Sequence, residues 1–218
     1  RVLFVYKDDR QTAEQFKTLL ETQPAAVDLV DTEGLMQVNL QGLDRILIGS
    51  DTEQFPNGEW PHNRWVSEDA VRALDGSNVP IIVLGIGGVS FLAALPGGSW
   101  MSGWYTWTNL ISSVRVVDRR DLAWRLVRIP VRGPVKLYNA ATETRSLFFN
   151  YPQGTWPPAD IKFIAREPAS NFHYPIAIEK GRFVLWAFSA GPSEMTAAGR
   201  QVFKNTVFPP ALRPPRPQ

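Results

Sequence analysis

Residues 79–95, VPIIVLGIGGVSFLAAL, are the segment that most restricts how this chain can fold. An apolar run at 81–84 leads into Gly85, Gly87 and Gly88, and a second apolar run follows them. A short apolar run bounded by turn signals is typical of a buried strand, and glycine allows the backbone to turn sharply. The segment therefore predicts a strand, a tight turn and a helix, the arrangement that holds the nucleophile in many α/β enzymes.

The first 95 residues alternate between strand-like and helix-like segments. A capping-box pattern at Thr12 and Gln15 predicts the start of one helix, and Ser67 is the predicted N-cap of another. Strands are expected at residues 2–6, 27–30, 46–48 and 81–84. This alternation predicts an α/β fold with a mainly parallel sheet and helices on both faces.

The second half of the chain loses this alternation. We expect residues 96–175 to form a mixed β excursion, and Lys180-Gly181 between two apolar runs predicts a hairpin. An amphipathic helix is expected between 193 and 208. Residues 1–208 are interpreted as a single domain, and the Pro-rich residues 209–218 as a stiff tail or linker of a larger protein.

Composition excludes several classes of protein. The 218 residues include no cysteine, which excludes a disulfide framework, a cysteine-ligated metal and a thiol nucleophile. No apolar run reaches about 18 residues, so membrane insertion is not predicted, and the compartment is left open. The formal charge of +2 predicts no nucleic-acid partner. The basic stretch 115–136 is interpreted as a solvated face, with a phosphate or polyanion contact as the alternative.

The turn Gly85-Ile86-Gly87-Gly88, in its strand–turn–helix context, resembles the class I glutamine amidotransferase-like superfamily, which has a flavodoxin-like fold. The resemblance covers the N-terminal half of the chain. It returns at residues 181–207, which are similar to the family's last strand, the loop after it and the closing helix. The turn is also similar to that of trehalose-utilisation-like domains, a non-catalytic branch in which it reads Gly-Ile-His-Gly-Gly.

The residues that this resemblance would make catalytic are absent. Enzymes of the family carry a cysteine at the tip of the turn, where this chain has Gly87, and a histidine in the loop that here runs from Ser189 to Glu194. Glu194 corresponds to the family's partner acid but has no histidine to orient. A nucleophile needs a base within reach and a third group that holds the base. We therefore expect a non-catalytic binding or interaction module rather than an enzyme.

A hydrolase that acts on a sugar or an ester is the alternative. Ser90 could be a displaced nucleophile, although a serine at this place can also pack the helix or bond to its own backbone. The other candidates are a pair of carboxylates among Asp8, Asp51 and Glu53. His62 and His173 are each isolated in sequence, and no cluster of histidines and acids predicts a metal site. No cofactor is implied.

Ligands of open α/β sheets bind beyond the carboxyl ends of the strands. We expect that edge to carry Lys7, Asp8, Asp9, Ser50, Asp51, Glu53, Gly87, Gly88, Ser189 and Glu194. The acidic side chains would suit a hydroxyl-rich ligand or a cation. Alternatively, they only solvate the edge and cap helices.

Tryptophan is unusually frequent, with eight in the chain. Five of them crowd two loops that flank the predicted edge: Trp60, Trp65, Trp100, Trp104 and Trp107. An indole has a large apolar surface and one N–H donor, so it can fill a core, form an interface or stack on a ligand. The interface interpretation makes this chain an oligomerisation module, with a second copy or another domain of the same protein as its partner.

Overall fold

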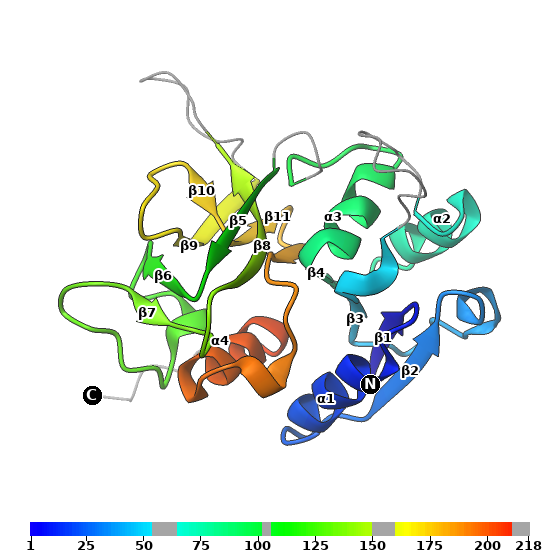
Figure 1. Ribbon diagram of the computed structural model, residues 1–218. Coiled ribbons are helices and arrows are strands. Elements are labelled where there is room, and N and C mark those ends of the chain that lie inside the picture. Colours follow the sequence, from blue (N-terminus) through cyan, green and yellow to red (C-terminus); the bar gives the residue numbers. More distant parts are fainter. Residues whose placement is uncertain (54–64, 102–105, 150–159, 211–218) are drawn as a thin grey trace, which may run out of the picture.

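The computed structural model describes residues 1–53, 65–101, 106–149 and 160–210 (Figure 1). Within these residues, nine strands form one sheet in the order β2-β1-β3-β4-β12-β11-β9-β6-β7. The first five run parallel: β2 (Val27–Asp31), β1 (Val2–Tyr6), β3 (Arg45–Ile48), β4 (Ile81–Leu84) and β12 (Phe183–Trp186). The others are antiparallel to their neighbours: β11 (Ile176–Glu179), β9 (Ile161–Arg166), β6 (Ser113–Val116) and β7 (Val135–Lys136).

Helices cover both faces of the parallel part of the sheet (Figure 1). On one face lie α1 (Arg10–Leu20) and α4 (Ala197–Val207), and on the other α2 (Glu68–Gly76) and α3 (Gly85–Ala94). The ring of Phe16 links the first pair, because it packs on Phe4 of β1 at 5.3 Å and on Phe203 of α4 at 5.0 Å. The expected α/β fold of flavodoxin-like type is confirmed.

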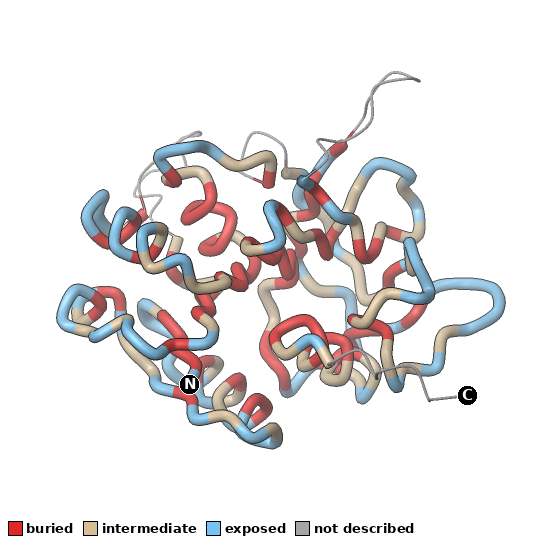
Figure 2. The backbone as a smooth tube through the Cα atoms, turned by 180° about the vertical axis from the view of Figure 1, so that it is seen from behind, coloured by how far each residue is buried: buried red, intermediate tan, exposed pale blue. Residues whose placement is uncertain are grey.

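The parallel strands are buried on both faces, as a sheet between two helical layers requires. In β1, Val2 and Phe4 belong to the core under α1 and α4, whereas Leu3 and Val5 belong to the core under α2 and α3. Figure 2 shows the buried positions concentrated along these strands and the inner sides of the helices. The sheet is therefore a firm support for the loops at its two ends.

A second, antiparallel sheet has the order β10-β8-β5 and contains β10 (His173–Tyr174), β8 (Thr142–Phe148) and β5 (Thr106–Ile111). The strand-like segments expected in the excursion are thus divided between the two sheets. β8 also joins the main body, because Arg145 N–H donates to the carbonyl of Ala187 and Ser189 N–H donates to that of Glu143. This pairing brings β8 to the end of β12.

Several local predictions can be compared with these elements. Ser67 caps α2 by accepting from Ala70 N–H, and the hairpin turn at Lys180-Gly181 is confirmed. The capping box at Thr12 is wrong, because Asp9 is the N-cap of α1 and its carboxylate accepts from Thr12 N–H. An aspartate is at least as good an N-cap as threonine, so the helix begins earlier. Short 3-10 turns complete the fold: η1 (Leu35–Gln37), η2 (Ser50–Thr52), η4 (Leu122–Trp124) and η5 (Pro192–Glu194).

Candidate functional site at the carboxyl edge of the sheet

The sharp turn after β4 lies at Gly85 rather than at Gly87. Gly85 has a φ of +47° and is the first residue of α3, so Gly87 already lies inside the helix. A Cβ atom on Gly87 would lie 2.4 Å from the carbonyl oxygen of Gly49, and one on Gly88 would lie 2.5 Å from the Cβ of Val83. Close approach of the helix to η2 and β4 therefore requires both glycines. The residue with the positive φ of a sharp strand–helix turn is therefore Gly85, whereas the sequence analysis placed the tip of the turn at Gly87.

The three strand ends expected to meet at this edge do meet. A Cβ atom on Gly85 would lie 2.6 Å from the Oγ of Ser189 and 2.9 Å from the Cβ of Ser50. Ser50 Oγ donates to the carbonyl of Ser189 at 3.0 Å. The Ser189 Oγ is buried and has no hydrogen-bond partner among the described residues. Two serines thus fill the space in front of the turn, and a side chain at residue 85 would displace them.

The carboxylates of the edge are mostly engaged in holding the structure. Asp51 Oδ2 accepts the N–H groups of Lys7, Asp8 and Asp9 at 2.7–2.9 Å, which fastens the loop after β1 to η2. Asp9 caps α1, and the Asp8 side chain is exposed, with its nearest cation, the Lys7 ammonium, 3.9 Å away. A carboxylate that accepts three backbone donors is a structural group. Asp8 and Asp51 therefore do not form an acid–base pair facing a common ligand.

Glu53 differs from these acids. Burial raises the pKa of its carboxyl, the guanidinium of Arg145 opposes this rise, and the nearby Glu143 adds to it. Arg145 and Glu143 project from β8, and their Nε and Oε1 atoms are 3.9 Å apart. Neither residue was predicted from the sequence. The polar run Thr-Glu-Thr-Arg of 142–145 does not show that this segment pairs with the residues after β12.

The remaining candidates of the sequence analysis lie elsewhere. Ser90 is buried, and its hydroxyl donates to the carbonyl of Ile86 at 3.0 Å, one helical turn back. The side chain of Glu194, in η5, is exposed, and its charge acts on Tyr138 rather than at the turn. In the basic stretch, Arg119 donates to the carbonyl of Pro130, so this arginine fastens its own loop.

The tryptophans that the structure describes do not form one platform at this edge. Trp60 and Trp104, like His62, lie outside the described residues. Trp65 is buried, its indole N–H donates to Thr52 Oγ1 at 3.0 Å, and its ring packs edge-on against Phe91. Trp100 is partly buried in the loop after α3, and Trp107 is 58% exposed on β5.

His173 is held by a buried acid that sequence reasoning did not identify. Its Nδ1 lies 3.2 Å from Oε2 of Glu167, which also accepts from the side-chain amide of Asn109 at 2.8 Å. Trp107 stacks on the imidazole with 6.0 Å between ring centres. Within the described residues, no three histidines or acids are grouped so as to hold a metal, and no helix is long and apolar enough to cross a membrane.

No protein-family model and no curated protein matches this sequence. Several solved structures are similar in fold. PurLQS from Thermotoga maritima matches with a TM-score of 0.56 at 9% identity, covering 94% of this chain and 96% of that chain. The glutaminase domain of CTPS from Trypanosoma brucei was solved with bound acivicin. It has a TM-score of 0.52 at 14% identity, covering 94% of this chain and 91% of that chain. A putative GMP synthase subunit from Thermoplasma acidophilum has a TM-score of 0.51 at 13% identity, covering 94% of this chain and 92% of that chain. The chain therefore shares its fold with these three proteins.

Proposed function

We propose that this domain is a non-catalytic relative of glutamine amidotransferase domains and acts as a binding or interaction module of a larger protein. The observation that carries the proposal is the turn at Gly85. Residue 85 has no side chain, and the hydroxyl of Ser189 lies only 2.6 Å from where a Cβ would be. In this proposal residue 85 takes the position of the nucleophile, has no side chain that could react, and has no room for one.

The groups around the turn support the same conclusion. Ser189, in the loop where the resemblance places a histidine, is a neutral hydroxyl whose Oγ is buried. Ser50 and Ser90 both donate to backbone carbonyls, so neither hydroxyl is paired with a base. General-base catalysis needs a proton acceptor within about 3 Å of the nucleophile. The hydrolase alternative, which needs Ser90 or a carboxylate pair, has no such arrangement at these residues.

The comparisons support the role of a module within an assembly. The Thermoplasma acidophilum neighbour is one subunit of its synthase, and the Trypanosoma brucei neighbour is one domain of its protein. A domain that has lost its reactive groups can be retained when its surface still binds another part of such a protein. The branch of trehalose-utilisation-like domains remains part of this proposal.

The test of the catalytic claim measures ammonia release from glutamine and covalent labelling by acivicin, the compound bound to the Trypanosoma brucei domain. A fluorophosphonate probe is added for activated serines. We expect neither turnover nor labelling. Ammonia release or a stable adduct would overturn the proposal, and the variants Ser90→Ala and Ser50→Ala would then show which hydroxyl reacts.

A second candidate function is self-association through the small sheet. β5 is the edge strand of that sheet within the described residues, and its Trp107 and Leu110 are 58% and 67% exposed. A six-residue edge strand with exposed apolar side chains is a template for pairing with another strand. The partner in this candidate is β5 of a second copy, paired antiparallel about a two-fold axis.

Light scattering of the purified chain tests this candidate. We expect a dimer that Trp107→Lys converts to a monomer. The control Leu126→Lys, at an exposed position outside β5, should leave the dimer intact. A wild-type chain that is monomeric at micromolar concentration would exclude self-association.

A further inference from the structure

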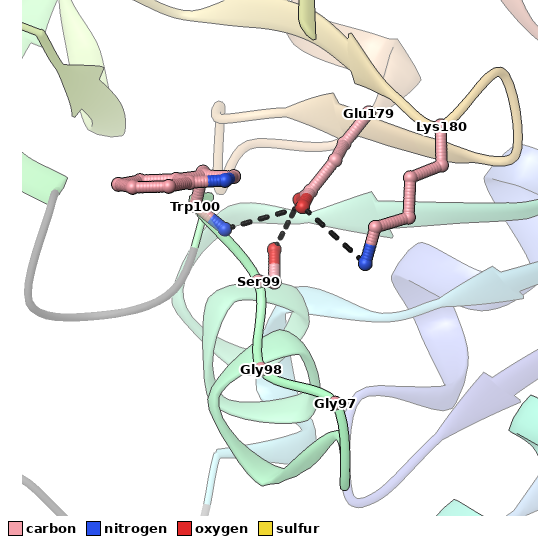
Figure 3. A pocket seen from close by; sticks show the side chains of 6 residues that line it. All are labelled: Gly97, Gly98, Ser99, Trp100, Glu179 and Lys180. Carbon is pink, nitrogen blue, oxygen red and sulfur yellow. Dashed lines mark hydrogen bonds and ion pairs between the residues drawn. The ribbon is translucent and has the colours of Figure 1, made fainter. Parts of the chain in front are cut away.

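A cavity of about 290 Å³ lies beside the hairpin turn at Lys180 (Figure 3). It is lined by Gly97, Gly98, Ser99, Trp100, Glu179 and Lys180. Glu179 pairs with Phe183 at the start of β12, and Phe183 pairs with Ile81 at the start of β4. β4 therefore separates the cavity from Gly85 by about 13 Å, at about 3.3 Å per residue. The cavity is a separate site from the candidate edge.

A buried carboxylate borders the cavity. The Glu179 side chain is 1% exposed, and it accepts from Ser99 Oγ at 2.5 Å and from Trp100 N–H at 3.3 Å. A buried charge is tolerated only when it is paired and hydrogen-bonded, and a carboxylate has about four acceptor sites. The bond at Oε1 is the long one of the two. Glu179 therefore has acceptor capacity left at that oxygen.

The cation nearest to Glu179 is loosely held. Lys180 Nζ lies 3.9 Å from Glu179 Oε1, beyond hydrogen-bond distance, and its side chain is 49% exposed. Figure 3 shows this ammonium directed toward the carboxylate. The guanidinium of Arg182 is already committed, because it donates to Asp75 at 2.7 Å and to neighbouring backbone carbonyls. The two charges at the cavity thus form a long ion pair with no hydrogen bond between the ammonium and the carboxylate.

The backbone at Lys180 supports a functional role for this side chain. Lys180 has a φ of +53° and Gly181 a φ of +62°, within the three-residue turn 180–182 that connects the paired residues Glu179 and Phe183. A lysine in the left-handed region is strained, and such strained residues concentrate at ligand sites. The chain thus keeps an ammonium at a position where asparagine or glycine would fit without strain.

We propose that this cavity binds a small zwitterion of the α-amino-acid type. The ammonium of the ligand would bind Oε1 of Glu179, and its carboxylate would bind Nζ of Lys180. A zwitterion presents both charges a few ångströms apart, as the site does, and would give each protein charge a hydrogen-bonded partner in place of the 3.9 Å ion pair. A simple cation would face the lysine, and a simple anion would face the glutamate, each with repulsion.

The size of the cavity fits a small ligand. Pockets for small molecules hold about 300–1,000 Å³, so this cavity lies at the lower end. A Cβ atom on Gly97 or Gly98 would meet no atom within 4 Å. That part of the lining is open and leaves room for the side chain of an amino acid.

Titration calorimetry on the chain with each of the twenty common amino acids tests the proposal. We expect at least one to bind with a Kd below about 1 mM, and its amine and its carboxylic acid, each lacking one charge, to bind at least about tenfold more weakly. The proposal is overturned if no amino acid binds in this range, or if either single-charge analogue binds as well as the parent.

Variants locate the site. Glu179→Gln and Lys180→Asn should each weaken binding by at least about tenfold, whereas Glu68→Gln, an exposed control on α2, should not change it. Asparagine suits the positive φ of residue 180, so this variant keeps the test valid if the buried Glu179→Gln fails to fold. Unchanged binding in Lys180→Asn would contradict the assignment. This result is independent of the absence of catalysis at Gly85, which the ammonia assay tests separately.

Discussion

Replacement of Gly85 by alanine is the most direct physical test of the turn. The φ of +47° places residue 85 in the left-handed region, which costs a residue with a Cβ about 1–2 kcal/mol. The new methyl group would lie 2.6 Å from Ser189 Oγ and 2.9 Å from Ser50 Cβ. Overpacking of this kind costs about 1–3 kcal/mol. Together, these effects predict that Gly85→Ala lowers the free energy of unfolding by about 2–5 kcal/mol.

Chemical and thermal unfolding followed by tryptophan fluorescence measures this loss. For a chain of this size, each kcal/mol shifts the Tm by about 2–4 °C, so we expect a decrease of about 4–20 °C. Gly76→Ala is the matched control, because Gly76 is the last residue of α2 and a Cβ there would meet no atom within 4 Å. It should be neutral or stabilising by up to about 1 kcal/mol.

A second substitution separates the two causes of the loss. Ser189→Gly in the Gly85→Ala background removes the 2.6 Å contact but leaves the unfavourable φ. We expect it to recover only part of the lost stability, as a double-mutant cycle would reveal. If Gly85→Ala were as stable as the wild type, the turn would not be at Gly85, and the argument that the nucleophile position is enclosed would fail.

Three further substitutions test other parts of the structure. Asp51→Ala removes the acceptor of three backbone N–H groups and should cost about 1.5–3 kcal/mol in urea unfolding, and a neutral result would contradict that structural role. Burial raises the pKa of the Glu53 carboxyl above its value in the unfolded chain. The free energy of unfolding therefore decreases as the pH rises from the unfolded pKa through the folded pKa, because the folded state must then bury a charge. Glu53→Gln should therefore raise the Tm at pH about 7 but not at pH about 4, and an equal effect at both would contradict burial as the cause. Tyr138→Phe leaves the buried indole N–H of Trp186 and the partly buried carbonyl of Ala190 unpaired and should cost about 1–3 kcal/mol in the same assay, whereas no loss would exclude those bonds as stabilising.

The parallel half of the fold could be predicted because its strands are short buried runs. β1 and β4 were expected at the residues where they occur, since apolar side chains face both helical layers and no other element fits four to five such residues. The start of α2 was predicted from Ser67, whose side chain bonds to a residue three positions away. Signals of this kind are local, and a single sequence contains them.

Contacts between distant segments could not be predicted in this way. Three glycines follow β4, and their order in the sequence does not show that Gly85 has the positive φ and that Gly87 lies against the carbonyl of Gly49. Glu143 and Arg145 reach the candidate edge because β8 pairs with residues 187–189, more than 40 positions away. Trp65 and Trp107 have similar polar and aromatic neighbours in sequence, yet one is buried and the other exposed.

The two ends of the sheet differ in how firmly their polar side chains are bonded within the protein. At the carboxyl edge, Asp51 holds three backbone donors and Ser50 bonds to the segment after β12, so internal bonds occupy these groups. At the opposite end, the charges of Glu179 and Lys180 are 3.9 Å apart beside an open cavity. A ligand that binds both groups would gain from both charges, because Glu179 is buried and the Lys180 ammonium reaches it only at 3.9 Å. This contrast supports the proposal that a small charged ligand binds at the end of the strands opposite Gly85.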